Sequence, residues 1–477
     1  MRTKLGLPPP PTGTCNIIDD IGLKCLFGDC ACRGRYFAKC DIGDAYTKAT
    51  RARPAGYMYM PDTIKQFDDD GCEMVACLTT PLWGEVEAGF EWDVELHETL
   101  LAEGWRQCSG VPAMYYFNGP DSDCRLVKIV DDIGFSESSP EQTITKATIA
   151  RLRARYNNQV TSDLDPTSFA GYKLAITRDA QGTRVALSQE LKITEAVRKY
   201  MPELLEGHVP TVATGTRLDA ELDALTLPKE RTSKLDGDQK LTQRIIGDLK
   251  YFERGTCPRL TRRVHRLSCI MGFPPPEALH AAKGVLADAY HHRHEKIVFA
   301  ANSTTPETPV DGCVGAVLTR GAPATLEVCC DAALVPVPVY SVLMTYGGAS
   351  ILHCTKKIGP AVASTHDAEN VATVKASELA VYARIVLGAL GVPIDGATTI
   401  LTDNLSNQRV AQNAQSSSRS RYYLIRSACL HQRVADGEIA VAHVRDEENP
   451  ADFLTKTIPS AKTEDSIRYA LGALPKP

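Results

Sequence analysis

The sequence predicts an α+β fold for the first half of the chain, and three observations support this class. Alternating β-branched residues at 125–129 predict a strand, and 133–135 predicts its antiparallel return. An amphipathic helical pattern precedes this hairpin, and a basic helical pattern follows it. Extended segments come next, so the order is strand, helix, hairpin, helix, strand. That order is typical of an α+β layer.

Length and composition predict a globular protein with several domains. The 477 residues are 43% hydrophobic, enough for two to four ordinary cores. The sixteen cysteines lie in a long chain without an N-terminal signal pattern, which favours free thiols in a reducing compartment. No run of 18 apolar residues occurs, so we expect no membrane span. A zinc site is the less favoured interpretation, because no CxxC pair occurs among Cys25, Cys30, Cys32 and Cys40.

The first elements lead up to the acidic hairpin. Residues 1–14, with four consecutive prolines, predict an extended arm. Asp41 follows a short β-prone run, and a helical turn is expected directly after it. Apolar residues at four-residue steps within 82–104 predict an amphipathic helix that ends at Gly104. A strand at 113–117 and a turn then lead into the hairpin.

The segments after the hairpin predict a β-hairpin with a helix and then a helical region. Residues 171–200 read as strand, glycine turn, strand and helix. Residues 205–240 have few apolar positions, which indicates a linker or a loosely packed connector. Residues 241–300 are helical again and contain ten Lys and Arg against five acids. We expect four of these basic residues to face nucleic acid, with a solvated charged face as the equal alternative. They are Arg259, Arg262, Arg263 and Arg266.

The last part of the chain predicts a second α/β unit with acids at the ends of its elements. A strand at 326–330 runs into one acid, and a strand at 398–401 ends near another. Ser364 is a predicted N-cap, which places a third acid in the second turn of the following helix. A fourth acid precedes the last helical segment. The four acids are Asp331, Glu369, Asp403 and Asp452.

Two sets of acids are therefore candidates for binding divalent metals. The first set combines Asp41 with Asp131 and Asp132, the pair at the tip of the hairpin. The second set is the four acids of the last unit. Adjacent carboxylates raise one another's pKa unless a cation lies between them, and two-metal phosphodiester chemistry needs such convergent oxygen ligands. The alternative for the hairpin pair is an ordinary surface turn.

A series of motifs in one order resembles the reverse transcriptase and ribonuclease H region of Copia-type LTR retrotransposon Pol polyproteins. AKCDIGDAY is similar to the family's DVKTAF segment, LWGEVEAGFEW to LYGLKQAPRxW, and KIVDDIGF to the YVDD hairpin. FAGYKLAITRDAQGTRVALSQ, RIIGDLKYFERGTCPRL and ALHAAKGVL also have counterparts in the family. In the last unit the matching segments are EVCCDAA, STHDAEN, TILTDNLSNQRVAQN, SSRSRYYLIR and ENPADFLTK. Together these segments extend from about residue 33 to residue 456.

The resemblance implies two active sites with two Mg²⁺ or Mn²⁺ ions each. It assigns Asp41, Asp131 and Asp132 to polymerisation by a reverse-transcriptase palm. It assigns the four acids of the last unit to hydrolysis of RNA in an RNA–DNA hybrid by an α/β ribonuclease H-like domain with a mixed sheet. The implied partners are RNA template, DNA primer, RNA–DNA hybrid, deoxynucleoside triphosphates and other retroelement proteins, in the cytoplasm, in particles or in the nucleus. Arg419 and Arg421 are further expected nucleic-acid contacts.

The same resemblance implies a domain division and contains departures from the family. We expect an arm at 1–14, a partial reverse transcriptase at 15–204, a linker with a helical thumb or connection at 205–299, a linker at 300–312 and a ribonuclease H-like domain at 313–477. Ile129 stands where the family has Tyr, and forty residues precede Asp41, fewer than the family's fingers region needs. We therefore expect a truncated copy with an impaired polymerase. The alternatives are an inactive nucleic-acid-binding relic or ribonuclease H activity alone.

One histidine near the fourth acid has two interpretations. His443 lies nine residues before Asp452, so it could assist proton transfer at the second set of acids. The favoured interpretation is an ordinary strand histidine within AVAHVRD.

Overall fold

The computed structural model describes most of the chain in two compact units. The described residues are 15–51, 56–157, 159–208, 212–228, 234–300, 307–309, 317–319, 325–359, 362, 364–412 and 421–472, without the side chains of 307–309, 317–319 and 421–426. Unit 1 contains residues up to Asp19 and Arg35–Ala170, and unit 2 contains Asp20–Gly34 and everything from Gly171 onward. The expected arm at 1–14 and most of the expected linker at 300–312 lie outside the described residues. The division at Ala170 falls inside the segment expected to form one domain.

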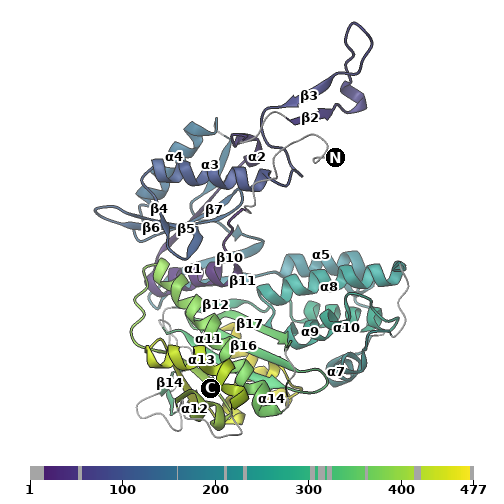
Figure 1. The fold of residues 1–477 in the computed structure, drawn as a ribbon, viewed down its shortest axis with the longest axis vertical. Helices are drawn as coiled ribbons and strands as arrows, with labels where there is room; N and C mark the ends of the chain where they lie inside the picture. The colour runs from purple at the N-terminus through teal and green to yellow at the C-terminus, as the bar shows by residue number, and fades with distance from the viewer. Residues whose placement is uncertain are drawn as a thin grey trace. The chain divides into compact units, whose positions relative to one another are not determined.

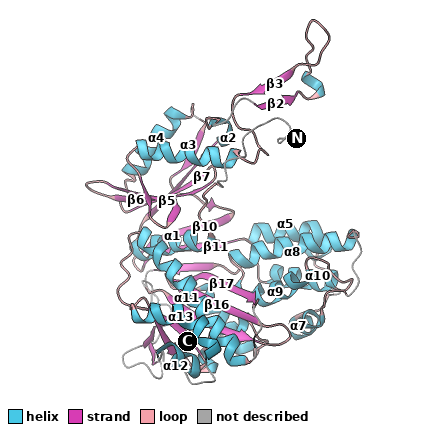
Figure 2. Cartoon of the chain, viewed as in Figure 1, coloured by secondary structure: helices cyan, strands magenta, loops and turns pink. Residues whose placement is uncertain are grey.

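Unit 1 is a six-stranded antiparallel sheet with two helices, in the strand order β4-β5-β6-β7-β1-β8. Figures 1 and 2 show the sheet and the helices. Alternating strand residues and apolar residues of both helices share one core, because successive strand side chains point to opposite faces. The strands are β1 (Tyr36–Ile42), β4 (Arg106–Cys108), β5 (Val111–Asn118), β6 (Asp123–Ile129), β7 (Asp132–Glu137) and β8 (Val160–Asp163), and the helices are α3 (Ala88–Ala102) and α4 (Thr143–Arg155).

Unit 1 also has smaller elements. A separate two-stranded sheet pairs β2 with β3 in antiparallel register, and its exposed side chains include Tyr57 and Tyr59. The smaller elements are α2 (Ala45–Lys48), β2 (Gly56–Tyr59), η2 (Asp62–Ile64), β3 (Val75–Leu78) and β9 (Ser168–Phe169). The turn at α2 and the helix α3 confirm the predicted elements, although α3 begins six residues later than the pattern indicated.

Unit 2 begins with an unexpected helix and an antiparallel hairpin. Helix α1 (Asp20–Arg33) is buried continuously from Ile21 to Ala31, so it has no polar face for a periodicity argument to detect. Strands β10 (Tyr172–Asp179) and β11 (Gly182–Ser188) form the predicted hairpin, and β12 (Ile297–Ala300) pairs with β11. Helix α1 packs against β11 and β12.

A group of helices follows the hairpin and shares one apolar core. Residues 205–240, expected to be a linker, contain α7, whose Leu218 and Leu222 are fully buried in that core. The expectation of a loosely packed connector is therefore partly wrong. Two leucines four residues apart are enough to anchor a short helix. The helices are α5 (Glu190–Tyr200), α6 (Pro202–Leu205), α7 (Gly215–Ala224), α8 (Gly237–Gly255), η3 (Pro258–Leu260), α9 (Thr261–Ile270) and α10 (Ala278–His291).

The rest of unit 2 contains a five-stranded mixed sheet, ordered β17-β16-β15-β18-β19. Strands β16 and β17 of this sheet are labelled in Figure 2. β15 pairs antiparallel with β16 and parallel with β18, and β18 pairs parallel with β19. Helix α11 packs on β15 and β16. The strands are β13 (Glu307–Pro309), β14 (Val317–Thr319), β15 (Glu327–Ala333), β16 (Val339–Tyr346), β17 (Ala349–Lys357), β18 (Thr398–Thr402) and β19 (Ile439–His443), with β13 and β14 forming a separate pair. The helices are α11 (Thr365–Ala389), α12 (Leu405–Gln412), α13 (Arg421–Ala435), η4 (Asp446–Glu448), η5 (Asp452–Leu454) and α14 (Ser460–Leu471).

Two further findings bear on the sequence predictions. The Ser364 hydroxyl accepts a hydrogen bond from the backbone N–H of Asp367 at 3.2 Å, which confirms the predicted N-cap of α11. Across the described parts of the chain, every helix is too short or too polar to cross a membrane.

Candidate metal centres

The first set of acids lies where β1 meets the tip of the β6–β7 hairpin in unit 1. Asp41 is paired with Asp132 in the register of β1 and β7. The backbone N–H of Ile42 donates to the carbonyl oxygen of Asp131 at 3.2 Å, which ties the hairpin turn to the end of β1. Cys40 and Ile42 point into the helix-covered core, so Asp41 between them points to the opposite face.

The electrostatics of this group agree with a close arrangement of carboxylates. Burial and then the charge of Asp131 raise the pKa of Asp41. Burial, Asp41 and Asp131, in that order, raise the pKa of Asp132. The three acids are half-buried and lie on one strand end and one turn. The structure therefore brings the first set together at the level of the backbone.

The second set of acids converges more tightly, at the sheet of unit 2. Oxygens of Asp331, Glu369 and Asp403 lie within 4.8 Å of one another, close enough for one metal ion. Asp331 is on β15 and Asp403 directly follows β18, so the parallel pairing of these strands brings the two acids to one edge. Glu369 approaches from α11, which packs on β15. Among the described residues, both three-acid groups with this spacing are in unit 2.

Burial makes these carboxylates costly to leave charged and unpaired. The Asp331 side chain is fully buried, and burial raises its pKa despite the opposing charge of Lys456. Burial, followed by the charges of Asp331 and Asp403, raises the pKa of Glu369. One Glu369 oxygen accepts a hydrogen bond from the backbone N–H of Ala332, whereas the other is buried without a hydrogen-bond partner. A buried orphan carboxylate oxygen fits a cation ligand.

A second group of three acids shares Asp403 with the first. Asp403, Asp446 and Asp452 also have oxygens within 4.8 Å of one another. Asp446 belongs to η4 and is exposed, and the sequence analysis did not select it. The three consecutive acids at 446–448 gave no spacing that singled out one of them. The buried Asp452 was selected, and it occupies the first position of η5.

Asn449 holds the Asp452 turn against β15 and was also missed. Its side-chain N–H donates to the carbonyl oxygen of Cys330 at 3.1 Å, and its side-chain oxygen accepts from the N–H of Ala451 at 3.0 Å. Asn449 is fully buried. An Asn before Pro reads from sequence only as a turn residue, so its partner on a distant strand could not be inferred.

Two lysines surround Asp452. The Lys456 ammonium lies 2.9 Å from Asp331, 3.6 Å from Asp452 and 4.0 Å from Asp403. Lys462, on α14, pairs with the other oxygen of Asp452 and donates to the carbonyl of Asp446. Lys456 was not selected from the sequence, although its place four residues after Asp452 is a helical spacing that puts both side chains on one face.

His443 lies beside the second set of acids but is held by the backbone. Its Nε2 atom lies 3.1 Å from the carbonyl oxygen of Asp403, so this nitrogen carries the proton and donates it. His443 is the last residue of β19. The contact fits the strand-histidine interpretation, because it uses Nε2 for a hydrogen bond to the backbone and leaves only Nδ1 for another partner.

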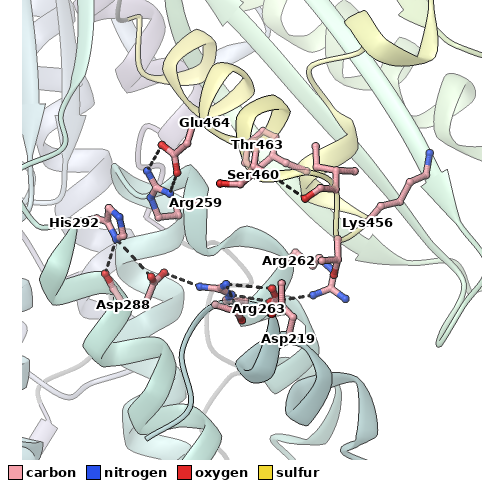
Figure 3. A pocket seen from close by; sticks show the side chains of 15 residues that line it. Asp219, Arg259, Arg262, Arg263, Asp288, His292, Lys456, Ser460, Thr463 and Glu464 are labelled. Atoms are coloured by element: carbon pink, nitrogen blue, oxygen red, sulfur yellow. Dashed lines mark hydrogen bonds and ion pairs between the residues drawn. The ribbon is translucent and has the colours of Figure 1, made fainter. Parts of the chain in front are cut away.

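The four arginines of the helical region have carboxylate partners rather than an open face. Arg259 pairs with Glu295 and with Glu464 of α14, both at 2.6 Å. Figure 3 shows the pair of Arg259 with Glu464. Arg263 pairs with Asp219 and with Asp288, each at 2.8 Å. The remaining ion pairs are Arg262 with Asp219 and Asp223, and Arg266 with Asp223.

These pairs favour neither interpretation made from the sequence, and contact of the four arginines with nucleic acid stays a prediction. The arginine side chains are between 8 and 15% exposed, so they form neither a solvated face nor a free phosphate-binding surface. Asp219 and Asp223 of α7 and Glu464 of α14 lie outside residues 241–300, so the charge count of that segment did not include them. Asp288 and Glu295 were counted, but a count does not show which charges pair. Arg419 lies outside the described residues, and Arg421 begins α13 but its side chain is not among those described.

The chain is similar to three curated proteins, all named as retrovirus-related Pol polyproteins from transposons. It is 24% identical to that of transposon RE1 and 23% identical to that of RE2, both from Arabidopsis thaliana, over 93% of this chain. It is 20% identical to that of TNT 1-94 from Nicotiana tabacum over 86% of this chain. The alignments cover 28 to 29% of the relatives, so the chain spans less than a third of their length. No family model matches the chain.

Proposed function

We propose that this chain, a homologue of retrotransposon Pol polyproteins, cleaves the RNA strand of RNA–DNA hybrids at the acids of unit 2. The convergence of Asp331, Glu369 and Asp403 within 4.8 Å is the observation that carries the proposal. The mixed sheet that holds these acids is the architecture expected of a ribonuclease H-like domain. The proposed ions are Mg²⁺ or Mn²⁺, because an all-carboxylate site suits hard divalent cations.

The residues of the site have separable roles in this proposal. Asp331, Glu369 and Asp403 supply oxygen ligands, and Asp452 extends the set toward a second position. When bound, divalent ions supply a nucleophilic water at neutral pH and neutralise charge that develops on the phosphate. Burial of Asp331 excludes bulk water from one side of the acids and thereby strengthens their interaction with any cation.

The test is cleavage of a labelled RNA–DNA hybrid by the purified chain. We expect RNA-strand cleavage that requires Mg²⁺ or Mn²⁺ and that falls at least about a hundredfold in Asp403→Asn, by analogy with the loss of other charge-stabilising groups in active sites. Asp395→Asn is the matched control, because Asp395 is an exposed acid in the loop before β18. Equal cleavage by Asp403→Asn and wild type would refute the assignment.

We further propose that the acids of unit 1 are a polymerase site with RNA template, DNA primer and deoxynucleoside triphosphates as substrates. The register pairing of Asp41 with Asp132, and the bond from Ile42 to Asp131, support this proposal. These three acids do not form one of the groups within 4.8 Å, whereas the acids of unit 2 do. Ligands that are less convergent bind a metal pair less tightly.

The two activities are therefore expected to differ in strength. Hybrid cleavage should be readily detected, and primer extension should be weak, because polymerisation must orient template, primer and triphosphate together. Asp131→Asn should abolish the weak primer extension and leave hybrid cleavage unchanged. Strong extension that Asp131→Asn abolishes, without any hybrid cleavage, would show that unit 1 is the working site.

A further inference from the structure

Lys456 occupies a position that the proposed nuclease function does not explain. The backbone N–H of Lys456 donates to the carbonyl of Asp452 at 2.9 Å, so a helical turn brings the side chain back over the acids. Its ammonium group is 2.9 Å from an Asp331 oxygen and 3.6 Å from an Asp452 oxygen. These two carboxylates are the most buried acids of the site, with side chains 0 and 2% exposed.

The ammonium group divides the four acids into two parts. Its contacts are with Asp331 and Asp452, and its distance to Asp403 is already 4.0 Å. Glu369 makes no ion pair with Lys456 among the described contacts, and one of its oxygens has no hydrogen-bond partner, as is also true of the Asp452 oxygen nearest the ammonium. The group of Asp331, Glu369 and Asp403 therefore keeps two acids that the ammonium does not closely contact, whereas the ammonium lies between Asp331 and Asp452.

We propose that Lys456 is a built-in competitor for a second divalent ion, which can bridge Asp331 and Asp452 only when the lysine side chain leaves. This inference rests on the proposed metal site. A divalent ion that bridged Asp331 and Asp452 would lie within a few ångströms of the ammonium group in its present place, and like charges at that separation repel strongly. The competition falls less on a first ion at the Asp331, Glu369 and Asp403 group, because Asp331 is the one acid of that group in close contact with the ammonium.

The surroundings of Lys456 allow the exchange. Its side chain is 36% exposed, unlike the acids that it contacts, so it has a route to solvent. It also lines a cavity of about 300 Å³ beside Arg262, and its ammonium end extends away from the arginines there (Figure 3). Lys462 keeps a positive charge on Asp452 when Lys456 moves. Displacement therefore removes one of two counter-ions and leaves the Asp452 turn held by the other.

The first test counts Mn²⁺ ions bound by the full chain, using calorimetry and the electron paramagnetic resonance of free Mn²⁺. Wild type should bind one ion tightly and a second at least about tenfold more weakly, because a neighbouring positive charge weakens cation binding by that order. Lys456→Met, which keeps the length but not the charge, should tighten the second ion about tenfold or more. Lys456→Arg keeps the charge and should behave as wild type.

Lys375→Met is the matched control. Lys375 lies on α11, and within the described chain its one ion pair is with the exposed Glu378. It should leave both binding events unchanged. Equal stoichiometry and affinity in wild type and Lys456→Met, including no binding in either, would overturn the inference. Hybrid cleavage is measured separately, so a loss of the proposed activity with the metal-binding difference intact is a distinct result.

The second test needs no substitution and so does not depend on the folding of a variant. The rate of reductive methylation of Lys456 is measured by peptide mass spectrometry across a Mg²⁺ titration. The rate should rise severalfold over the concentrations at which the second ion binds, whereas the rate for Lys375 should stay constant. A constant rate for Lys456 through both binding events would show that the ammonium group stays in place and that Lys456 is a structural ion-pair partner.

Discussion

The indole N–H of Trp92 donates a hydrogen bond to the carbonyl oxygen of Val130 at 2.8 Å. Trp92 is fully buried on α3, and Val130 begins the two-residue turn between β6 and β7. Val130 has φ near 59°, a left-handed conformation that is unfavourable for a β-branched residue. The helix therefore holds the turn that carries Asp131 in a conformation that the chain alone would avoid.

Replacement of Trp92 by Phe should loosen the acidic hairpin. The substitution removes the hydrogen bond and part of a buried ring, with an expected loss of about 2 kcal/mol in unfolding free energy. Hydrogen exchange at the Asp131 and Asp132 amides should accelerate beyond this global effect. Trp105→Phe is the control, because Trp105 is equally buried and its indole donates to Thr148 instead. Similar exchange at the hairpin in both variants would contradict the role of Trp92.

Replacement of Val130 by Gly should be far less harmful than an ordinary core truncation. Glycine adopts a positive φ without cost, which recovers roughly 1 kcal/mol and offsets the lost side-chain contacts. Val127→Gly, in the middle of β6, removes a fully buried side chain from a regular strand and should cost about 3 kcal/mol. Urea unfolding of both variants measures the difference. An equal loss in the two would show that Val130 carries no strain.

Removal of two of the paired arginines should change stability and leave nucleic-acid binding unaltered. Arg262→Ala with Arg263→Ala removes both arginine partners of the mostly buried Asp219 and leaves Asp288 with His292, which should cost about 3 kcal/mol. The salt dependence of hybrid binding should keep its log–log slope. Contacts with phosphates would instead flatten the slope by about two units. Arg217→Ala is the control, because its side chain is 81% exposed.

The stability of unit 2 should fall in acid because of His353. Its Nδ1 accepts from the Ser350 hydroxyl at 2.9 Å, and its Nε2 donates to the carbonyl of Glu253 at 2.6 Å. Burial, with a contribution from Lys24, lowers the pKa of His353 from 6.5 to about 3. The unfolded chain then binds more protons below pH 6.5, so stability falls as the pH falls from 6.5 toward 3, by about 3 kcal/mol at pH 4.

His353→Gln isolates this contribution, because an amide can both donate and accept but does not titrate. The variant should lose less stability than wild type between pH 7 and pH 4 in thermal unfolding, by about 3 kcal/mol. Parallel pH profiles for wild type and His353→Gln would show that His353 is not the group whose protonation matters.

The parts of the fold that follow from local patterns were predictable. Alternation around Asp131 and Asp132 predicted β6 and β7, and the cap at Ser364 predicted the start of α11 and the place of Glu369 in it. In each case the signal lies within a few residues of the feature. The convergence of the two sets of acids came from the family resemblance, since the spacing of acids in sequence does not specify which strand ends meet.

The features that the sequence did not reveal depend either on residues far apart in the chain or on a segment that is buried on all sides. The arginine partners at Asp219, Asp288 and Glu464 lie 25 to 205 residues away from the arginines that they neutralise. Helix α1 was missed because burial on all sides leaves no period to read. Lys456 belongs to the segment ENPADFLTK, but the family resemblance of that segment identified Asp452 and gave no role to Lys456.

The candidate metal centre and the helical core both depend on contacts from helix α14. Through Lys462 it contacts Asp452 of the candidate metal centre, and through Glu464 it contacts Arg259 of the helical core. A stop codon ahead of Ser460 would remove the supports of both at once. We therefore expect the loss of α14 to weaken the acidic site and the helical core together, even with all four acids intact.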